Sequence, residues 1–213
     1  MKDENIGLES IEKQVPPSSK ILNQVAEPID VEYIKSPEIK NLISKLFIVA
    51  KGRQGDANFP TLVGLAAPQI GFSKRIVIIG TNSVGDGKQP QLEIFINPEL
   101  TDFSEDTVGG REGCFSTGRV CGIVERFSQV TIEAYDKNGI KFKRTLEGFP
   151  ARIAQHEVDH LNGIRFPDKI TDDSKLHWVE EAEFGSYRKD WKSWTTLCPR
   201  NKWLAIKSGK LVS

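Results

Sequence analysis

Apolar residues recur three or four positions apart over 37–51, which is the spacing of one buried face of a helix. Ser36 is a favourable N-cap for this helix, a proline suits its first turn and Gly52 suits its end. A second helix is predicted over 151–161, with Pro150 at its start and Gly163 just past its end. A further helix is predicted over 173–184.

Two short apolar runs and one alternating stretch predict strands between these helices. The runs 75–80 and 92–97 are typical of buried strands, and the proline after the second run is predicted to end it. Apolar and polar residues alternate on both sides of the turn sequence DKNG within 129–146, which predicts a hairpin. The segments 59–71 and 101–113 show no strand or helix period and are predicted to be connections.

This order of elements predicts an α+β fold: mostly antiparallel sheets around the central helix 151–161, with an N-terminal helix and an irregular C-terminal segment. We expect one main domain over 21–170. The polar residues 1–20 are predicted to be a flexible leader. Residues 171–213 are predicted to form a helix and a tryptophan-rich tail that pack on the main domain. The alternative role for this tail is a docking surface for a dimer mate or a partner such as the ribosome.

The overall charge and the cysteine count narrow the class of protein. The 213 residues carry 29 basic and 29 acidic side chains, so no net charge favours nucleic acid or an anionic membrane. No apolar run is long enough to span a bilayer, and the acidic N-terminus is unlike a signal or transit peptide. Three cysteines, Cys114, Cys121 and Cys198, favour a reducing compartment over a disulfide framework. We therefore expect a cytoplasmic protein with neither a membrane nor a nucleic-acid partner.

The sequence HEVDH at 156–160 is the strongest chemical signal in the chain. His156 and His160 are four residues apart, so a helix places both imidazoles on one face, where they can bind one metal ion. Glu157 lies beside them and could act as general base for a metal-bound water, while either Asp159 or a backbone carbonyl could orient one imidazole. The alternative is a helix that carries two surface histidines and binds no metal.

Two residues could complete such a metal site. Glu180 follows His160 by 20 residues, a spacing compatible with an H-E-x-x-H metallopeptidase. Cys114 lies upstream between two glycine-rich stretches, where a thiolate can approach a metal without steric conflict and would be a strong ligand for zinc or ferrous iron. Taken alone, Cys114 also fits a small buried structural residue.

Three stretches, in order, resemble the signature motifs of the peptide deformylases: GLAAPQIG at 64–71, EGCFS at 112–116 and QHEVDHLNG at 155–163. The likeness covers about residues 20–170, which would be the catalytic domain. It implies a metal-dependent hydrolase that removes the formyl group from N-formylmethionyl peptides of newly made proteins and releases formate. It also implies one divalent ion, usually Fe(II), with Zn, Ni or Co accepted.

The resemblance assigns a role to each matching residue. It makes three residues the metal ligands, with water in the fourth position: Cys114, His156 and His160. Glu157 would take the proton of that water and hand it to the leaving amine. The side chain of Gln69 and the backbone N–H of Phe115 would, together with the metal, stabilise the developing oxyanion.

The same resemblance implies how the peptide binds. Val63 and Gly64 would offer main-chain hydrogen bonds to an extended substrate. The methionine side chain would enter an apolar pocket lined by Val63, Phe115, Ile153 and the helix around His156. Each of these roles comes from the likeness to the family.

Glu112 is expected to brace the loop that carries Cys114. In the family the matching glutamate is structural and pairs with a nearby basic group. Arg111 or Arg152 could be that group here.

Several positions depart from the family pattern. Leu62 stands where a glycine is common, Gly118 where a proline is common, and Cys121 near the place of a peptide-binding arginine that Arg119 could replace. These departures motivate a third hypothesis, a deformylase-like protein that binds peptides with little or no turnover. Every residue of the mechanism is nevertheless present, which favours the enzyme.

Overall fold

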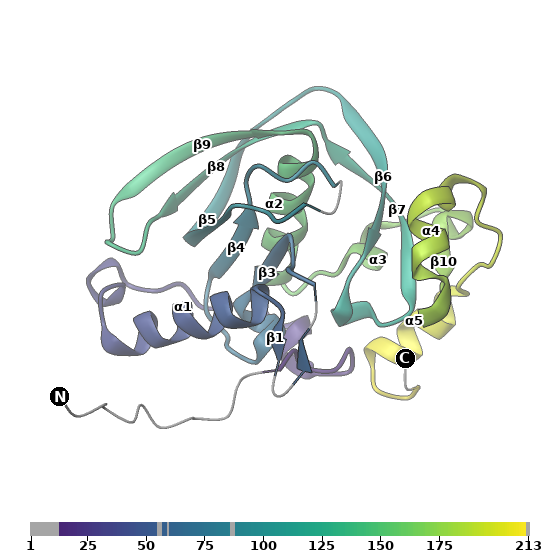
Figure 1. Ribbon diagram of the computed structural model, residues 1–213, viewed down its shortest axis with the longest axis horizontal. Helices are drawn as coiled ribbons and strands as arrows, with labels where there is room; N and C mark the ends of the chain where they lie inside the picture. Colours follow the sequence, from purple (N-terminus) through teal and green to yellow (C-terminus); the bar gives the residue numbers. More distant parts are fainter. Residues whose placement is uncertain (1–12, 55–56, 59, 86–87, 212–213) are drawn as a thin grey trace.

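The computed structural model describes residues 13–211 apart from 55–56, 59 and 86–87 (Figure 1). Its described part holds a five-stranded, a three-stranded and a two-stranded sheet, all antiparallel, and five α-helices. The helices are α1 (Pro37–Ala50), α2 (Gly148–Leu161), α3 (Phe166–Lys169), α4 (Phe184–Asp190) and α5 (Arg200–Lys207). The strands are β1 (Arg53–Gln54), β2 (Ala57–Asn58), β3 (Gly64–Ala66), β4 (Ile76–Gly80), β5 (Leu92–Phe103), β6 (Thr107–Gly113), β7 (Val120–Phe127), β8 (Gln129–Tyr135), β9 (Lys141–Glu147) and β10 (Leu176–Trp178). The mixed architecture confirms the predicted α+β class.

The five-stranded sheet, in the order β3-β4-β5-β8-β9, is covered on both faces. All of β4 is buried because its alternate side chains point to opposite faces. Ile76 and Ile78 pack on the side of α1, whereas Val77 and Ile79 pack on the side of α2. Ser36 caps α1 as predicted, since its Oγ accepts a hydrogen bond from the N–H of Ile39 at 3.2 Å.

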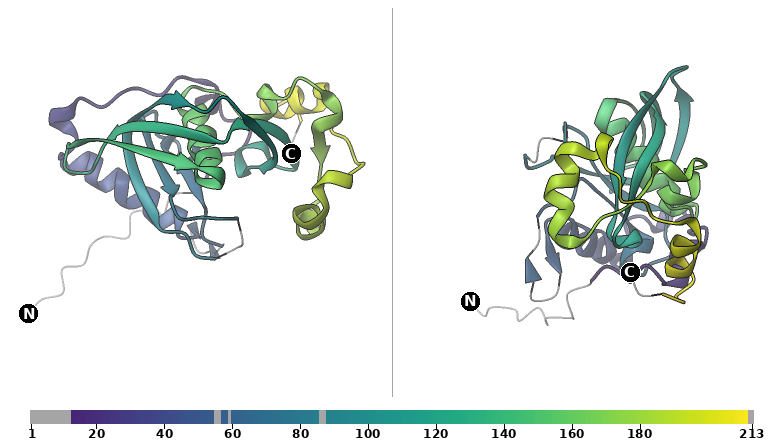
Figure 2. Two further views of the ribbon diagram at one scale, coloured as in Figure 1. Left: turned by 90° about the horizontal axis from the view of Figure 1, so that it is seen from above. Right: turned by 90° about the vertical axis from the view of Figure 1, so that its right-hand side faces the viewer.

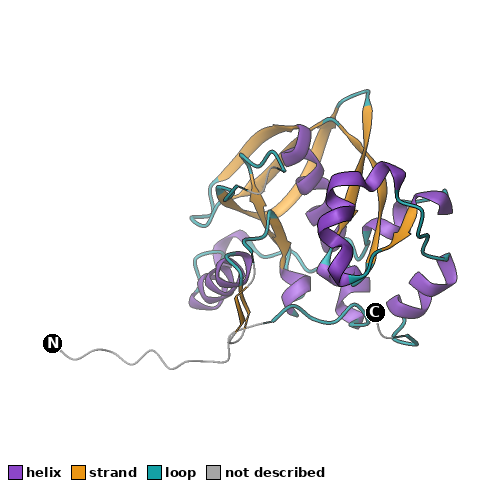
Figure 3. Ribbon diagram, turned by 45° about the vertical axis from the view of Figure 1, so that its right-hand side comes forward, coloured by secondary structure: helices purple, strands orange, loops and turns teal. Residues whose placement is uncertain are grey.

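Helix α2 lies between the two larger sheets, as Figures 1 and 3 show. Apolar residues of one face, among them Ile153 and Leu161, pack on the five-stranded sheet. On its other side the guanidinium of Arg152 donates to the carbonyl of Val124 in β7 at 3.0 Å. The helix begins at Gly148, three residues before the predicted start. The motif helix is therefore held on both sides, which fixes the direction of its side chains.

Strand β5 continues past the proline that was predicted to end it. The register with β8 shifts between Ile96 and Glu99, so Pro98 lies at a bulge, where the ladder needs no donor. Asn97 adopts a positive φ of 49°, and its side chain bonds both the N–H and the carbonyl of Ile29. The prediction was wrong because a proline ends a strand only where its missing N–H is required.

The two segments predicted to be connections also contain strands. Residues 101–113 include the end of β5 and all of β6, and 59–71 includes β3 and a 3-10 turn, Ala67–Ile70. Gly110 stands within β6 because a Cβ there would come within 2.7 Å of the guanidinium of Arg152. The glycines that suggested a loop thus permit close approach of a buried side chain.

The predicted helix over 173–184 is wrong. Residues 176–178 form β10, which pairs with the edge of β7, and α4 begins only at Phe184. Pairing with an exposed strand edge satisfies the backbone there in place of helical hydrogen bonds. Figure 2 shows α4 and α5 beside the three-stranded sheet, of which β10 is an edge strand.

The C-terminal segment packs on the rest of the chain through Trp203. This side chain is fully buried in a cluster with Val120, Phe166 and Ile206. The proposed boundaries at 21 and 171 stay predictions, and most of the predicted leader, residues 1–12, lies outside the described residues. Among the helices that the structure describes, none is both long and apolar enough to cross a membrane.

Candidate metal centre

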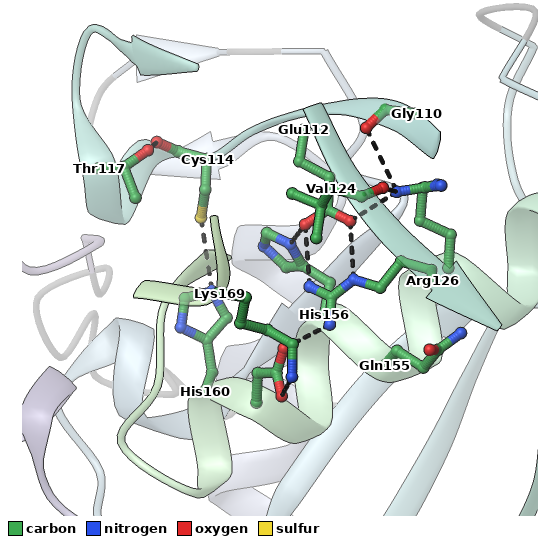
Figure 4. Close-up of polar contacts among 12 residues, drawn as sticks. Gly110, Glu112, Cys114, Thr117, Val124, Arg126, Gln155, His156, His160 and Lys169 are labelled. Carbon is green, nitrogen blue, oxygen red and sulfur yellow. Dashed lines mark hydrogen bonds and ion pairs between the residues drawn. The ribbon is translucent and has the colours of Figure 1, made fainter. Parts of the chain in front are cut away.

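The two histidines of HEVDH project from one face of α2, as the spacing predicts. Their ring centroids are 4.9 Å apart and the rings meet edge to face. Cys114 follows the end of β6 and comes to the same place, although 41 residues of chain lie between it and His156. The ligand atoms of these three residues all lie within 4.8 Å of one another (Figure 4).

The spacing of these atoms fits a tetrahedral metal ion. Cys114 Sγ and His160 Nε2 are 3.5 Å apart. Metal–sulfur and metal–nitrogen bonds of about 2.3 and 2.1 Å at a tetrahedral angle would separate the two ligand atoms by about 3.6 Å. One thiolate and two imidazoles are also a donor set that suits zinc and ferrous iron. The residues present therefore fit a single divalent ion.

Glu112 orients one of the imidazoles. Its Oε2 lies 2.8 Å from His156 Nδ1, so that nitrogen carries the proton and Nε2 is left with a lone pair for the metal. Its Oε1 accepts from Arg152 at 2.9 Å, as one of the two predictions had it, whereas Arg111 is not a partner. Asp159, one of the two candidates for orienting an imidazole, bonds Arg126 instead.

Arg126 is a residue that sequence reasoning missed. Its side chain donates to both oxygens of Glu112, at 2.9 and 3.0 Å, and also to Asp159. In the register of the three-stranded sheet Glu112 stands opposite Gly122, and Arg126 lies four residues further along β7, on the same face. Sequence reasoning could have found Arg126 only if residues 107–113 had been predicted as a strand.

The network around Glu112 keeps the carboxylate charged. Burial alone would raise its pKa, but hydrogen bonds from Arg126 and His156 hold the pKa far below the usual value for glutamate. Two arginines and one imidazole thus surround one buried carboxylate. Through its hydrogen bond with Nδ1, this carboxylate fixes the orientation of the His156 imidazole.

Removing Arg126 should destabilise the protein strongly. In Arg126→Met, Glu112 and Asp159 keep other partners but lose the central buried cation, so we expect about 3 kcal/mol less free energy of unfolding, measured by urea denaturation. Arg144→Met is the matched control, because Arg144 and its partner Glu93 are partly exposed and should contribute under about 1 kcal/mol. Equal effects of the two substitutions would contradict this interpretation of the network.

Glu157 is buried beside the cluster. It is 4% exposed, and its Oε2 has no hydrogen-bond partner among the described residues. Burial raises its pKa to about 7. A Cβ on Gly64 would lie 2.3 Å from Glu157 Oε1 and 2.7 Å from Ile153 Cγ2, so only glycine lets β3 approach this carboxyl group.

Gln69 directs its amide group toward the same cluster. Its Oε1 accepts from the N–H of Ala66 at 2.7 Å, which fixes which end of the amide points inward. Its Nε2 then donates to Cys114 Sγ at 3.3 Å and to Ser116 Oγ at 3.2 Å. Ser116 had no predicted role. Phe115 begins a 3-10 turn next to Cys114, and its side chain is half exposed.

Strand β3 is the edge strand of the five-stranded sheet. The carbonyl of Val63 accepts from the N–H of Gly80 at 2.7 Å, so the backbone of Val63 faces β4. Because hydrogen-bonding direction alternates along an antiparallel strand, the amide and carbonyl of Gly64 face the open edge. Of the two residues predicted to bind the peptide backbone, Gly64 is the one so directed.

The other singled-out residues lie elsewhere. Glu180 pairs with Arg119 at 2.8 Å and accepts from the indole of Trp178, so Glu180 does not join the histidines. Arg119, which could have replaced the peptide-binding arginine of the family, forms this ion pair with Glu180. Cys121 is buried against Tyr187, and Leu62 is partly buried and packs against the core cluster on the side of α1.

Comparisons with known proteins agree with one another. The family model described as polypeptide deformylase matches residues 12–176. Peptide deformylase 1 of Prochlorococcus marinus is 38% identical, over 68% of this chain and 74% of its own length. The peptide deformylase of Aquifex aeolicus is 35% identical, over 82% of this chain and 94% of its own length.

Solved structures give the same likeness. The actinonin-bound class I type b peptide deformylase of Acinetobacter baumannii is 31% identical with a TM-score of 0.64, and covers 76% of this chain and all (100%) of its own. The structure of that protein with Met-Ala-Ser bound is 30% identical with a TM-score of 0.65, and covers 75% of this chain and 98% of its own.

Proposed function

The chain belongs to the polypeptide deformylase family, metal-dependent hydrolases that remove the N-formyl group from newly made peptides, and from this premise we propose how its own residues perform the reaction. The observation that carries the proposal is the convergence of Cys114, His156 and His160 beside a buried carboxyl group and an inward amide.

We propose that these three residues hold one divalent ion, Fe(II) in the cell, with Zn, Ni or Co as functional replacements. The mixed thiolate and imidazole set supports this range, since such donors bind several first-row metals. When bound, the ion supplies a Lewis acid that activates water and polarises the formyl carbonyl. Glu112 keeps His156 in the tautomer that presents Nε2 to it.

Glu157 is the general base and acid in this proposal. Its carboxyl group is buried beside Gly64, at the edge where the peptide would lie, and Oε2 has no competing partner among the described residues. It takes a proton from the attacking water and delivers it to the leaving amine, so that formate and a free N-terminus result. Its burial excludes bulk water from that proton transfer.

Two donors stabilise the oxyanion that develops on the formyl oxygen. Gln69 presents its Nε2 to the cluster because Ala66 holds its Oε1. The backbone N–H of Phe115 is the second donor. Donors fixed before the reaction need no reorganisation as charge develops, and each is typically worth about 3 kcal/mol of transition-state stabilisation.

The peptide lies extended along the open edge of β3 and bonds the backbone of Gly64, with Val63 flanking it. The methionine side chain contacts Val63, Phe115 and Ile153 and the helix around His156. Val63 and Phe115 retain exposed apolar surface for contact with this side chain, and Ile153 packs beside Gly64. A related deformylase has been solved with Met-Ala-Ser bound, which supports a peptide substrate of this class.

We further infer that the enzyme acts in the cytoplasm and meets the ribosome transiently. N-formylmethionyl peptides are nascent chains, so the substrate is first present there. The three cysteines are free thiols, which suits a reducing compartment.

The test is formate release from formyl-Met-Ala-Ser by protein purified without oxygen and analysed for metal. We expect formate release from protein that holds one ion per chain, and no formate release after chelation. Acetyl-Met-Ala-Ser should not be hydrolysed. One ion per chain without formate release would favour the peptide-binding hypothesis. Hydrolysis of internal peptide bonds would favour the metallopeptidase.

A further inference from the structure

Arg165 is a buried arginine outside the predicted site. It is 1% exposed and lies directly before α3. Its guanidinium donates to the carbonyls of Pro17 at 2.6 Å and Ser116 at 2.9 Å, and to the side chain of Asn23 at 2.8 Å. It also lies 4.7 Å from the ring centroid of Trp203 in α5. One side chain thus joins the N-terminal segment, the turn after Cys114 and the C-terminal helix.

The charge of Arg165 is held without a directly bonded carboxylate among the described residues. The nearby carboxylate of Asp168 accepts instead from the backbone N–H of Arg165, from Trp203 Nε1 and from Lys207 Nζ. Burying a cation among neutral acceptors is costly, because no bonded carboxylate offsets the loss of its hydration. A planar fork with several fixed donors, however, can hold separate backbone segments in one geometry. This favours a role in geometry over a role in stability alone.

The carbonyl that Arg165 holds belongs to the residue that receives the amide of Gln69. Ser116 Oγ accepts from Gln69 Nε2 at 3.2 Å, and the same Nε2 lies 3.3 Å from Cys114 Sγ. Arg165 therefore fixes the backbone of the turn that presents both Cys114 and the partner of Gln69.

Gln69 is held from its other side by the segment that Arg165 also holds. The N–H of Val15 donates to the carbonyl of Gln69 at 2.8 Å. Two residues later in the chain, the carbonyl of Pro17 bonds Arg165. The guanidinium of Arg165 therefore bonds both the turn that carries Cys114 and the segment that bonds the carbonyl of Gln69.

We propose that Arg165 is a positioning residue: by holding Ser116 and Pro17 together, it sets the distance between the Gln69 amide and the Cys114 thiolate, and through Trp203 it ties that distance to the packing of α5. This inference rests on the proposed roles of Gln69 and Cys114. Because Gln69 acts on the transition state, loss of the clamp should lower kcat more than it changes KM.

The test compares Arg165→Lys and Arg165→Leu with Arg200→Leu. Arg200 is the matched control because it also donates to backbone carbonyls, those of Pro167 and Ile170, and also anchors α5, but it has no contact with the Cys114 turn in the described structure. Lysine keeps the charge of Arg165 without the fork. Each protein is loaded with Co(II), and its thiolate-to-cobalt charge-transfer band is recorded beside kcat and KM for formyl-Met-Ala-Ser.

We expect kcat to fall about 10- to 100-fold in Arg165→Leu, as a displacement near 1 Å can cause, and less in Arg165→Lys. KM should change by less than about threefold, and the cobalt band should shift in both variants. Arg200→Leu should keep the parental kcat and band even if it unfolds at lower urea. A folded Arg165→Lys protein with parental kcat and band would overturn the proposal, as would equal changes in Arg200→Leu. The cobalt band tests Arg165 even if the parent releases no formate, so the two proposals can fail separately.

Discussion

Replacing Glu157 with glutamine should lower kcat for formyl-Met-Ala-Ser by about 10³-fold, because positioned general acid–base catalysis typically contributes 10²–10⁴-fold. The change keeps the size of the side chain but removes the proton acceptor. Glu157 is outside the Cys114, His156 and His160 group, so the metal content should stay at the parental level. The measurement is formate release, beside metal analysis of the same preparation.

The stability of the variant distinguishes a catalytic role of Glu157 from a structural one. The carboxyl group of Glu157 is buried and its Oε2 has no partner among the described residues, so glutamine should leave the urea midpoint unchanged or higher. Asp159→Asn is the matched control, since Asp159 is also a carboxylate on α2 but pairs with Arg126 and Lys169. That variant should lose stability and keep kcat within about tenfold of the parent. Parental activity in Glu157→Gln would remove Glu157 from the mechanism.

Replacing Cys114 with alanine should abolish stable metal binding. The loss should exceed the roughly 10- to 100-fold drop in metal affinity that follows loss of an outer partner, because a thiolate ligand is removed outright. The measurement is metal per chain after desalting, and formate release should disappear with the metal. Cys121 and Cys198 are buried in other clusters of the structure and do not belong to the Cys114, His156 and His160 group.

Two controls distinguish this result from rival explanations. Glu180→Ala should keep one ion per chain, because Glu180 pairs with Arg119 away from the histidines. Cys198→Ala removes a thiol that is buried in the C-terminal cluster and should also keep the ion. If Cys114→Ala retained its metal while Glu180→Ala lost it, the metallopeptidase hypothesis would replace the deformylase site.

Local features of the sequence predicted the elements and the part of the site that depend on near neighbours. The cap at Ser36 and the spacing of apolar residues predicted α1, and the DKNG turn predicted the β8–β9 hairpin. The four-residue spacing of His156 and His160 predicted one shared face, because a helix repeats every 3.6 residues. Residues close in sequence constrain one another through the backbone alone.

The strands that were missed depend on partners far away in the chain. Pro98 is tolerated because β5 bulges against β8, and Gly110 is required because Arg152 occupies the space of its side chain. Residues 176–178 are extended because the edge of β7 is available. No local pattern contains that information, since sheet pairing satisfies backbone groups between segments that the sequence does not relate.

By itself, the sequence determined the family and the helix that carries His156, Glu157 and His160. Its likeness to that family singled out Cys114 and Gln69 as further residues of the proposed site. Only the tertiary structure decided which charges support them. The sequence offered Arg111 or Arg152 as a partner for Glu112, whereas the strand register brought Arg126 to it together with Arg152. A charge pair is chosen by position in space and by burial, and both exist only after the sheets and α2 have packed together.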